Sequence, residues 1–278
     1  MSQIIDQHIV LEYSPIKRLS DYAIGVFDDL PSRKSVKKAI LENRILVDDE
    51  VANTGTWIKN GMVISLLEPK YQSRPEYTID IPVIYEDDFL AVVNKPGGML
   101  TSGNVFRSLE NTLSHNLNIT GNYLPRPVHR LDSATCGLVL IAKDKNIRIK
   151  LGELLKVRLV KKEYHAVVTG TPPDTGEIKL DIEGKKSKTI FYNLEKSKDQ
   201  RFSLLKLIPV TGRTHQLRIH CSRMGFPIVG DKLYNGFNRG KGLFLCASKI
   251  EFDHPVTGER LKVKIDLPLK FRKLFNSD

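Results

Sequence analysis

The sequence HRLDSATCG at residues 129–137, followed by the apolar run LVLIA at residues 138–142, decides how this chain is interpreted. Its single carboxylate, Asp132, lies between the basic pair His129-Arg130 and a turn-forming Thr-x-Gly. The apolar run predicts a buried strand directly after the turn. Asp132 is therefore expected on a loop held by rigid structure, where active-site residues are often found.

The composition points to a large folded chain with an acidic partner. Its 278 residues are enough for one large domain and a small one, and 41% of them are hydrophobic, which allows a proper core. The net charge of +11 and the isoelectric point near 9.4 indicate a polyanion, most simply nucleic acid. Anionic membranes also attract basic proteins, but no apolar run approaches the roughly 20 residues that a membrane span needs.

The N-terminus and the cysteines predict a cellular location. No basic segment precedes an apolar one at the N-terminus, which argues against a signal peptide. The cysteines, at positions 136, 221 and 246, are too few and too scattered for a disulfide framework. We therefore expect a cytoplasmic protein with reduced thiols, and a monomer is the default expectation.

Residues 1–68 predict a small α/β domain. Ser32 is the expected N-cap of a helix in which Val36, Ala39, Ile40 and Leu41 form an apolar stripe. Residues 43–51 predict two strands joined by a turn, and residues 59–66 a turn followed by another strand. The same helix carries four basic residues: Arg33, Lys34, Lys37 and Lys38. A solvated helix face and a phosphate-contacting face are both consistent with this spacing.

The positive charge is divided unevenly along the chain. Residues 1–70 contain nine Lys and Arg against ten Asp and Glu, whereas the remainder contains 34 against 22. The basic character therefore lies in the C-terminal three quarters, with the helix near residue 36 as a local exception.

Residues 69–82 predict a linker, and residues 83–278 predict a second domain built mainly of short strands. Strands are expected at 89–94, 138–142, 162–169, 177–182, 188–194, 202–210, 243–252 and 260–265. Helices are expected at 145–160 and 211–223, and a polar loop up to about residue 127. Because strands outnumber helices without regular βαβ alternation, the predicted class is α+β on a mixed, mainly antiparallel sheet flanked by helices and loops.

The stretch around Asp132 resembles the signature of RluA-type RNA pseudouridine synthases, which reads roughly HRLDxxTSGLLLxAK. Four further segments follow the pattern of this family in order: VNKPGG at 93–98, KKEYHAVVTG at 161–170, TGRTHQLRIH at 211–220 and GDKLY at 230–234. Five ordered motifs are far more specific than one short match. The resemblance implies the pseudouridine synthase fold and an isomerase that needs no cofactor and no metal.

The chain departs from the family pattern at three places. Cys136 stands where most members have Ser, and Cys246 stands where the pattern has His. After Gly98 the sequence MLTSG replaces a common H-P-S. None of these changes touches the residues that are expected to act in catalysis.

The resemblance implies that Asp132 is the catalytic residue, whereas most loop aspartates form Asx-turns or N-caps. Isomerisation of uridine breaks the bond from the base nitrogen to the ribose, rotates the base and rejoins it through carbon 5. A carboxylate can attack the sugar or the base, or remove a sugar proton, and the sequence leaves these three roles open. A buried carboxylate needs a cation, and the resemblance implies that Arg218 is this partner, since a guanidinium suits a bidentate pair.

Further residues acquire expected roles by the same resemblance. Tyr164 is expected to stack on the flipped uracil, and Leu217 to pack on its other side. Ordinary strand and helix packing are the alternatives for these two residues. Arg130 is expected to help insert into the RNA, and His129 either contacts the RNA or makes a structural hydrogen bond.

Residues 1–68 resemble the RNA-binding domain first seen in ribosomal protein S-four. The basic helix, the hairpin at 45–51 and the strand after residue 61 follow that order. Asp48-Asp49 replaces the usual Asn-Gly turn, and Gly61-Met62 replaces Gly-Asp. The resemblance implies that the four basic helix residues contact RNA phosphates.

Other classes of function fit the sequence less well. A catalytically inactive RNA-binding or assembly factor has no need of Asp132, Tyr164 and Arg218 together. A hydrolytic nucleosidase would usually want two carboxylates near the sugar. His215, His220 and Cys221 lack metal-binding spacing. The sequence therefore predicts an RNA pseudouridine synthase acting on specific uridines of structured RNA, with ribosomal RNA favoured and transfer RNA next.

Overall fold

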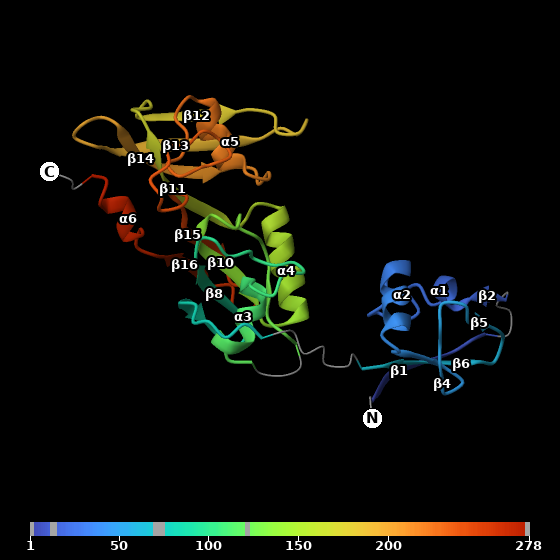
Figure 1. The fold of residues 1–278 in the computed structure, drawn as a ribbon. Coiled ribbons are helices and arrows are strands. Elements are labelled where there is room, and N and C mark those ends of the chain that lie inside the picture. Colours follow the sequence, from blue (N-terminus) through green and yellow to red (C-terminus); the bar gives the residue numbers. More distant parts are fainter. Residues whose placement is uncertain (1–2, 12–15, 69–75, 120–122, 276–278) are drawn as a thin grey trace. The chain divides into compact units, whose positions relative to one another are not determined.

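The computed structural model of the chain describes residues 3–11, 16–68, 76–119 and 123–275. The chain divides into two compact units, residues 1–73 and residues 74–278 (Figure 1). No described helix is both long enough and apolar enough to cross a membrane.

The first unit contains a four-stranded antiparallel sheet against which two helices pack. Its strand order is β1 (Ile4–Ile9), β6 (Val63–Leu67), β3 (Ile45–Val47) and β4 (Glu50–Val51). A short ladder joins β2 (Lys17–Arg18) to β5 (Trp57–Ile58), and the helices are α1 (Leu19–Tyr22) and α2 (Arg33–Leu41). Buried apolar side chains from both helices and from the sheet form one core, but Leu41, expected in the apolar stripe of α2, is 76% exposed at the end of that helix.

Two sequence predictions are confirmed in this unit. Ser32 caps α2, because its side chain accepts a hydrogen bond from the Ser35 N–H and the Ser35 side chain accepts one from the Ser32 N–H. Asp48 and Asp49 both adopt positive φ angles, 50° and 67°, in the two-residue turn between β3 and β4. This conformation suits an Asn-Gly turn, and aspartate also tolerates it.

The second unit is built on a ten-stranded sheet. The order along it is β12-β13-β14-β11-β15-β10-β8-β7, with β16 beside β15 and β9 beside β10. The bounds are β7 (Val83–Glu86), β8 (Leu90–Lys95), β9 (Arg126–Pro127), β10 (Cys136–Ala142), β11 (Lys161–Thr169), β12 (Thr175–Lys179), β13 (Lys188–Lys196), β14 (Phe202–Pro209), β15 (Leu245–Asp253) and β16 (Arg260–Lys264). Among these described strands β10 and β15 pair in parallel, and the other pairs are antiparallel. The predicted mixed, mainly antiparallel sheet is confirmed.

The apolar run at 138–142 forms the centre of this sheet. Val139 and Ile141 belong to one core cluster, whereas Leu138, Leu140 and Ala142 belong to a second cluster. Because successive side chains of a strand point to opposite faces, a strand that is buried on both faces reads as a continuous apolar run. This burial fixes the end of the loop that carries Asp132.

Four helices complete the second unit: α3 (Leu109–Asn116), α4 (Lys145–Lys156), α5 (Gln216–Arg223) and α6 (Leu269–Arg272). Leu151 of α4 lies in the cluster with Leu138, whereas Leu113 of α3 and Leu217 of α5 lie in the cluster with Val139. The helices thus pack against the central strands and leave the loops between them to form the site.

Three expectations about the second unit need correction. The expected polar loop before residue 127 contains α3, because Leu109, Leu113 and Leu117 recur every four residues and are buried. The helix expected from residue 211 begins at Gln216, because His215 before it adopts a left-handed conformation. Of the expected linker, residues 69–75 lie outside the described residues, and residues 76–82 pack on the second unit through the buried Ile81.

Candidate active site

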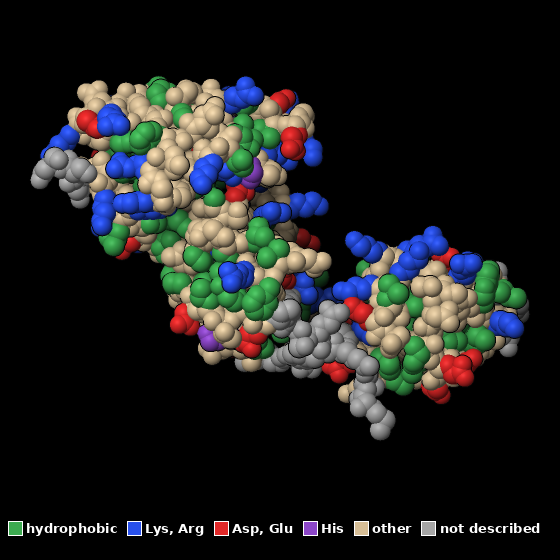
Figure 2. Space-filling model, viewed as in Figure 1, with side chains coloured by type: hydrophobic (Ala, Val, Ile, Leu, Met, Phe, Trp, Pro, Cys, Tyr) green, Lys and Arg blue, Asp and Glu red, His purple; other side chains and the backbone are tan. Residues whose placement is uncertain are grey.

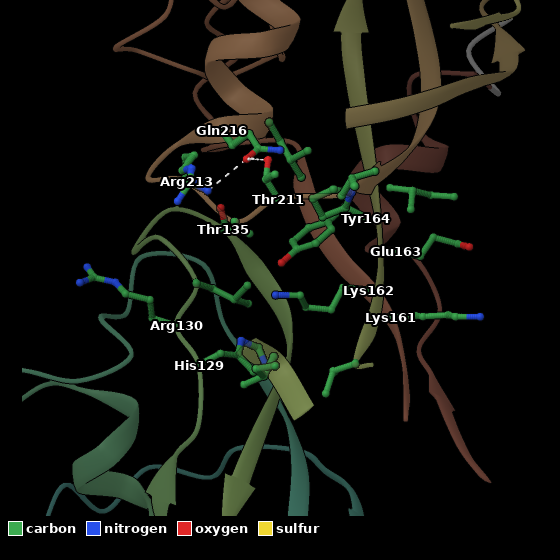
Figure 3. Close-up of a pocket in the computed structure, with 18 of the residues that line it drawn as sticks. His129, Arg130, Thr135, Lys161, Lys162, Glu163, Tyr164, Thr211, Arg213 and Gln216 are labelled. Carbon is green, nitrogen blue, oxygen red and sulfur yellow. Dashed lines mark hydrogen bonds between the residues drawn. The ribbon is translucent and has the colours of Figure 1, made fainter. Parts of the chain in front are cut away.

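A cavity of about 980 Å³ opens in the second unit between the Asp132 loop, the start of β11 and the loop that precedes α5 (Figure 3). Its basic lining residues outnumber its acidic ones. The basic residues are Arg130, Lys156, Arg158, Lys161, Lys162, Arg213, Arg218 and Lys249, and the acidic ones are Asp132, Glu163 and Glu251. Such a lining favours an anionic ligand.

The Asp132 loop leads directly into β10, which fixes its C-terminal end. Thr135 donates its N–H to the Asp132 carbonyl at 3.0 Å, which closes the turn. Gly137 follows with a φ angle of 116°, and a Cβ at this position would lie 2.3 Å from the Ala247 carbonyl oxygen. Only glycine fits between the paired strands β10 and β15 here, which explains the Thr-x-Gly of the motif.

A buried lysine ties this loop to the preceding hairpin. Lys95 is fully buried, and its Nζ donates to the carbonyl oxygens of Pro96, Met99 and Ser133 at 3.0, 2.8 and 3.2 Å. Burial lowers the pKa of Lys95 to about 8, although nearby Asp132 favours the charged form. Through Lys95, the VNKPGG motif therefore holds the backbone of Ser133, the residue after Asp132.

A threonine holds the other side of the loop. The buried Thr101 hydroxyl donates to the Leu131 carbonyl at 3.0 Å and accepts from the Leu131 N–H at 3.1 Å. Both backbone groups of Leu131, which precedes Asp132, are thereby satisfied by one side chain. The MLTSG sequence, which departs from the family pattern, thus still supports the loop.

Arg218 lies beside Asp132, as the sequence predicts, but its main partner is a different carboxylate. Its Nη1 is 3.5 Å from Asp132 Oδ2, whereas its Nε and Nη2 donate to Asp231 at 2.7 and 2.8 Å. Burial acts to lower the pKa of the Arg218 guanidinium, but Asp231 and Asp132 together raise it. Arg218 is thus a fixed cation held by Asp231 with one nitrogen turned toward Asp132.

Asp231 is itself anchored by the backbone. Its Oδ1 accepts hydrogen bonds from the N–H groups of Leu233 and Tyr234 at 3.1 and 3.3 Å, and Asp231 is 1% exposed. The Tyr234 ring lies 5.1 Å from the Arg218 guanidinium carbon. The GDKLY motif therefore supplies the residues that hold the Arg218 guanidinium in place. This role was not predicted from the sequence, although the motif was identified there.

His215 is a further neighbour of Asp132 that was not predicted. Its Nε2 lies 3.8 Å from Asp132 Oδ1, and its Nδ1 lies 2.9 Å from the Tyr234 hydroxyl. Its φ angle of 54° turns the side chain back toward the loop just before α5 begins. The left-handed conformation is uncommon outside glycine and marks a position set by its contacts.

The loop before α5 is organised by one glutamine. The buried Gln216 Oε1 accepts from the Thr211 hydroxyl at 2.7 Å and from the Arg213 N–H at 3.0 Å (Figure 3). Its Nε2 donates to the Lys188 carbonyl at 2.9 Å. The TGRTHQ sequence is thus a turn built around Gln216.

Tyr164 and Leu217 line the same cavity as Asp132. Tyr164 projects from β11 into the cavity (Figure 3), and it is 8% exposed. Burial, together with the charge of Asp132, raises the pKa of the Tyr164 hydroxyl, which therefore stays neutral. Leu217, at 7% exposed, combines a core position with a place in the cavity lining.

For His129 the structure favours the structural alternative. Its Nε2 accepts the Leu140 N–H at 3.1 Å, and burial lowers its pKa to about 3, so the ring is neutral. It therefore joins the loop to β10 rather than offering a charge to RNA. Arg130 is exposed at the rim of the cavity and extends away from the loop (Figure 3).

The four basic residues of α2 lie in the first unit and are exposed. Arg33 pairs with Asp21 at 3.0 Å, and Lys38 with Glu42 at 3.6 Å. Blue side chains gather on the face of this unit that α2 occupies (Figure 2).

The two cysteine departures from the family pattern lie side by side. Cys136 and Cys246 are paired residues of the parallel strands β10 and β15, and Cys246 is fully buried. Within the described residues, no group of three or more His, Cys, Asp or Glu side chains is placed to hold a metal ion.

Comparison with known proteins agrees with this geometry. Residues 89–223 match the model of the RNA pseudouridylate synthase family. The chain is 32% identical to ribosomal large subunit pseudouridine synthase C of Rickettsia felis, over 94% of this chain and 97% of that protein. It is 34% identical to the mitochondrial tRNA pseudouridine(32) synthase of Saccharomyces cerevisiae, over 87% of this chain and 55% of that protein.

A solved structure shares the fold. Human RNA pseudouridylate synthase domain containing 1 aligns with a TM-score of 0.58 and 27% identity, over 69% of this chain and 86% of that chain. The chain belongs to the RNA pseudouridine synthase family and is an enzyme that isomerises uridine in RNA to pseudouridine.

Proposed function

We propose that Asp132 carries the isomerisation, with Arg218 and Tyr164 as its working partners. The observation that supports this most is the placement of the Asp132 carboxylate 3.5 Å from the Arg218 guanidinium, in a cavity that Tyr164 also lines. Arg218 supplies the positive charge that a carboxylate in a partly closed site needs. Three hydrogen bonds hold the loop in place: Lys95 and Thr101 bind the carbonyls of Ser133 and Leu131 on either side of Asp132, and Thr135 binds the carbonyl of Asp132 itself.

The reaction is balanced without any external group. The bond between ribose carbon 1′ and base nitrogen 1 breaks, and a bond between carbon 1′ and base carbon 5 forms. Carbon 5 then loses its proton, and nitrogen 1 gains one. Asp132 acts by attacking the sugar or the base, or by taking a sugar proton, and each role uses its free carboxylate oxygen.

Tyr164 supports the base during this rearrangement. Because the target uridine must leave its stack, an aromatic face in the cavity replaces the lost stacking energy, worth about 1–3 kcal/mol per base. The neutral hydroxyl of Tyr164 lies in the same cavity and is available for a hydrogen bond. Leu217 offers an apolar contact to the base, and Arg130 at the rim reaches toward the flanking RNA.

The first unit is proposed to bind RNA in the manner of the S-four-like domain. Lys34 and Lys37 are exposed on α2 beside Arg33 and Lys38, so this helix offers several cations to one phosphate backbone. Two units with separate basic surfaces suit a structured RNA.

The substrate is proposed to be ribosomal RNA, with transfer RNA as the second candidate. A relative that matches over nearly its whole length is named for the ribosomal large subunit, and a relative of which the chain covers 55% is named for tRNA. A non-catalytic assembly factor is less favoured, because the Asp132 carboxylate and its Arg218 partner are intact. A cytoplasmic location and a monomeric state stay predictions.

Pseudouridine mapping tests this proposal. Total RNA from a strain lacking the gene is compared, by carbodiimide labelling and sequencing, with RNA from strains complemented by the wild type or by Asp132→Asn. We expect sites that disappear in the deletion strain and return only with the wild type. Restoration by Asp132→Asn would exclude Asp132 as the catalytic residue, and an unchanged map would favour the assembly factor.

A further inference from the structure

Lys162 is a cation inside the cavity that the roles above do not use. It lies on β11 two residues before Tyr164, so both side chains leave the same face of the strand. Figure 3 shows the Lys162 ammonium and the Tyr164 ring extending into the cavity, whereas Lys161 and Glu163 extend to the opposite side. The Lys162 ammonium is therefore presented to whatever occupies the cavity.

No counter-charge to Lys162 lies among the described residues. Among the described residues no carboxylate lies within ion-pair distance of its ammonium, and no side-chain hydrogen bond holds it. Burial alone lowers the pKa of Lys162. An ammonium that burial shields from water and that has no partner is costly to the folded protein, and an anion that enters the cavity would offset this cost.

The position of Lys162 indicates which negatively charged group its ammonium pairs with. Lys162 is two residues from Tyr164 on β11, whereas Arg218 is the cation that lies 3.5 Å from Asp132. The RNA substrate is neutral at its uracil and ribose and carries its negative charge on the phosphodiester groups. A phosphate next to a uridine that enters the cavity is therefore the group that this ammonium suits.

We propose that Lys162 is an RNA-binding residue whose ammonium pairs with a backbone phosphate of the strand that carries the target uridine. The inference rests on the proposed function, because it takes RNA as the occupant of the cavity. It assigns to Lys162 a share in binding the strand and none in bond rearrangement.

Lys264 provides a matched control. Lys162→Met and Lys264→Met remove the same charge from strands of one sheet, but Lys264 is exposed on β16 and does not line the cavity. Lys162→Arg keeps the charge, and Lys162→Gln serves as a second neutral variant. RNA from the deletion strain, which carries the unmodified sites, is the probe, and its dissociation constant is measured for the full chain over a series of KCl concentrations.

Loss of one phosphate contact has a defined signature. We expect Lys162→Met to weaken RNA binding about fivefold to tenfold and to reduce the slope of log affinity against log salt by roughly 0.7 to 1. Lys264→Met should stay within about twofold of the wild type, and Lys162→Arg should bind nearly as well as the wild type. The melting temperature of Lys162→Met should be equal to or above that of the wild type, because a desolvated cation has been removed.

Two outcomes would overturn the inference. Equal affinity and equal salt slope for Lys162→Met and Lys264→Met would show that Lys162 meets no phosphate. A lowered melting temperature for both neutral variants, with unchanged RNA affinity, would show a structural lysine instead. Pseudouridine formation by the wild type is scored separately on the same RNA, so a binding defect without any wild-type turnover would contradict the proposed function and leave the phosphate contact standing.

Discussion

Arg218 donates two hydrogen bonds to the buried carboxylate of Asp231, and its remaining terminal nitrogen lies 3.5 Å from Asp132. One guanidinium thus joins a structural carboxylate to the proposed catalytic one. A bidentate pair fixes the plane of the guanidinium, and the plane fixes where the third nitrogen points. The geometry of the site therefore depends on a residue that does not touch the reacting atoms.

Asp231→Asn should impair turnover through Arg218. The amide cannot accept two charged hydrogen bonds, so the guanidinium loses its fixed plane, and we expect turnover to fall about 10- to 100-fold. The free energy of unfolding should fall as well, by roughly 3 kcal/mol, because a buried cation keeps only part of its compensation. RNA affinity should change little.

Asp266→Asn is the control for this variant. It removes the same charge from an exposed side chain whose only described ion pair, with Arg272, spans 3.8 Å. Single-turnover rates and urea unfolding of both variants test whether Asp231 positions Arg218. Equal rates for the two variants would show that Asp231 does not position Arg218.

Thr101→Val should loosen the Asp132 loop. The substitution keeps the shape of the side chain but removes the hydroxyl that serves both backbone groups of Leu131. Leaving these buried groups unpaired should cost about 1–3 kcal/mol of unfolding free energy. We expect a lower turnover number with unchanged RNA affinity, measured beside Thr101→Ser, which retains the hydroxyl and should behave like the wild type.

Lys95 should make stability depend on pH above neutrality. Burial lowers its pKa in the folded state to about 8 from the ordinary value of 10.5, so between these values the unfolded chain binds more protons than the folded one. Stability relative to Lys95→Met should therefore rise as the pH increases from about 8 toward 10.5. Denaturant unfolding of both proteins across this range measures the difference, and a falling difference would contradict the lowered pKa.

Charge reversal on α2 tests the role of the first unit. Lys34→Glu combined with Lys37→Glu should weaken RNA binding by about tenfold or more and reduce its salt dependence. The limiting rate of turnover at saturating RNA should stay within a few-fold, because these residues lie outside the cavity unit. Lys59→Glu, exposed in the same unit but outside α2, is the control. Equal affinities for the two proteins would mean that α2 does not contact RNA.

Local patterns were enough to predict the framework of the protein. The apolar run after Gly137 predicts a strand that is buried on both faces, and the Ser32 cap predicts the start of α2; both are present. α3 was missed because polar residues surround its three leucines and mask their spacing. The start of α5 was misplaced because the conformation of His215 depends on contacts with Tyr234, 19 residues later.

The sequence by itself determined the family, the α+β class and the set of residues around Asp132, because those properties are written in short contiguous motifs. Only the tertiary structure decided which residues of these motifs face the reaction and which hold the others in position. Lys95 and Thr101 reach the Asp132 loop from separate segments, and Asp231 reaches Arg218 from another; these contacts exist only where the fold brings the segments together. Hydrogen bonds and ion pairs act over a few ångströms, so a role that depends on a distant partner is set by the fold and not by neighbours in the chain.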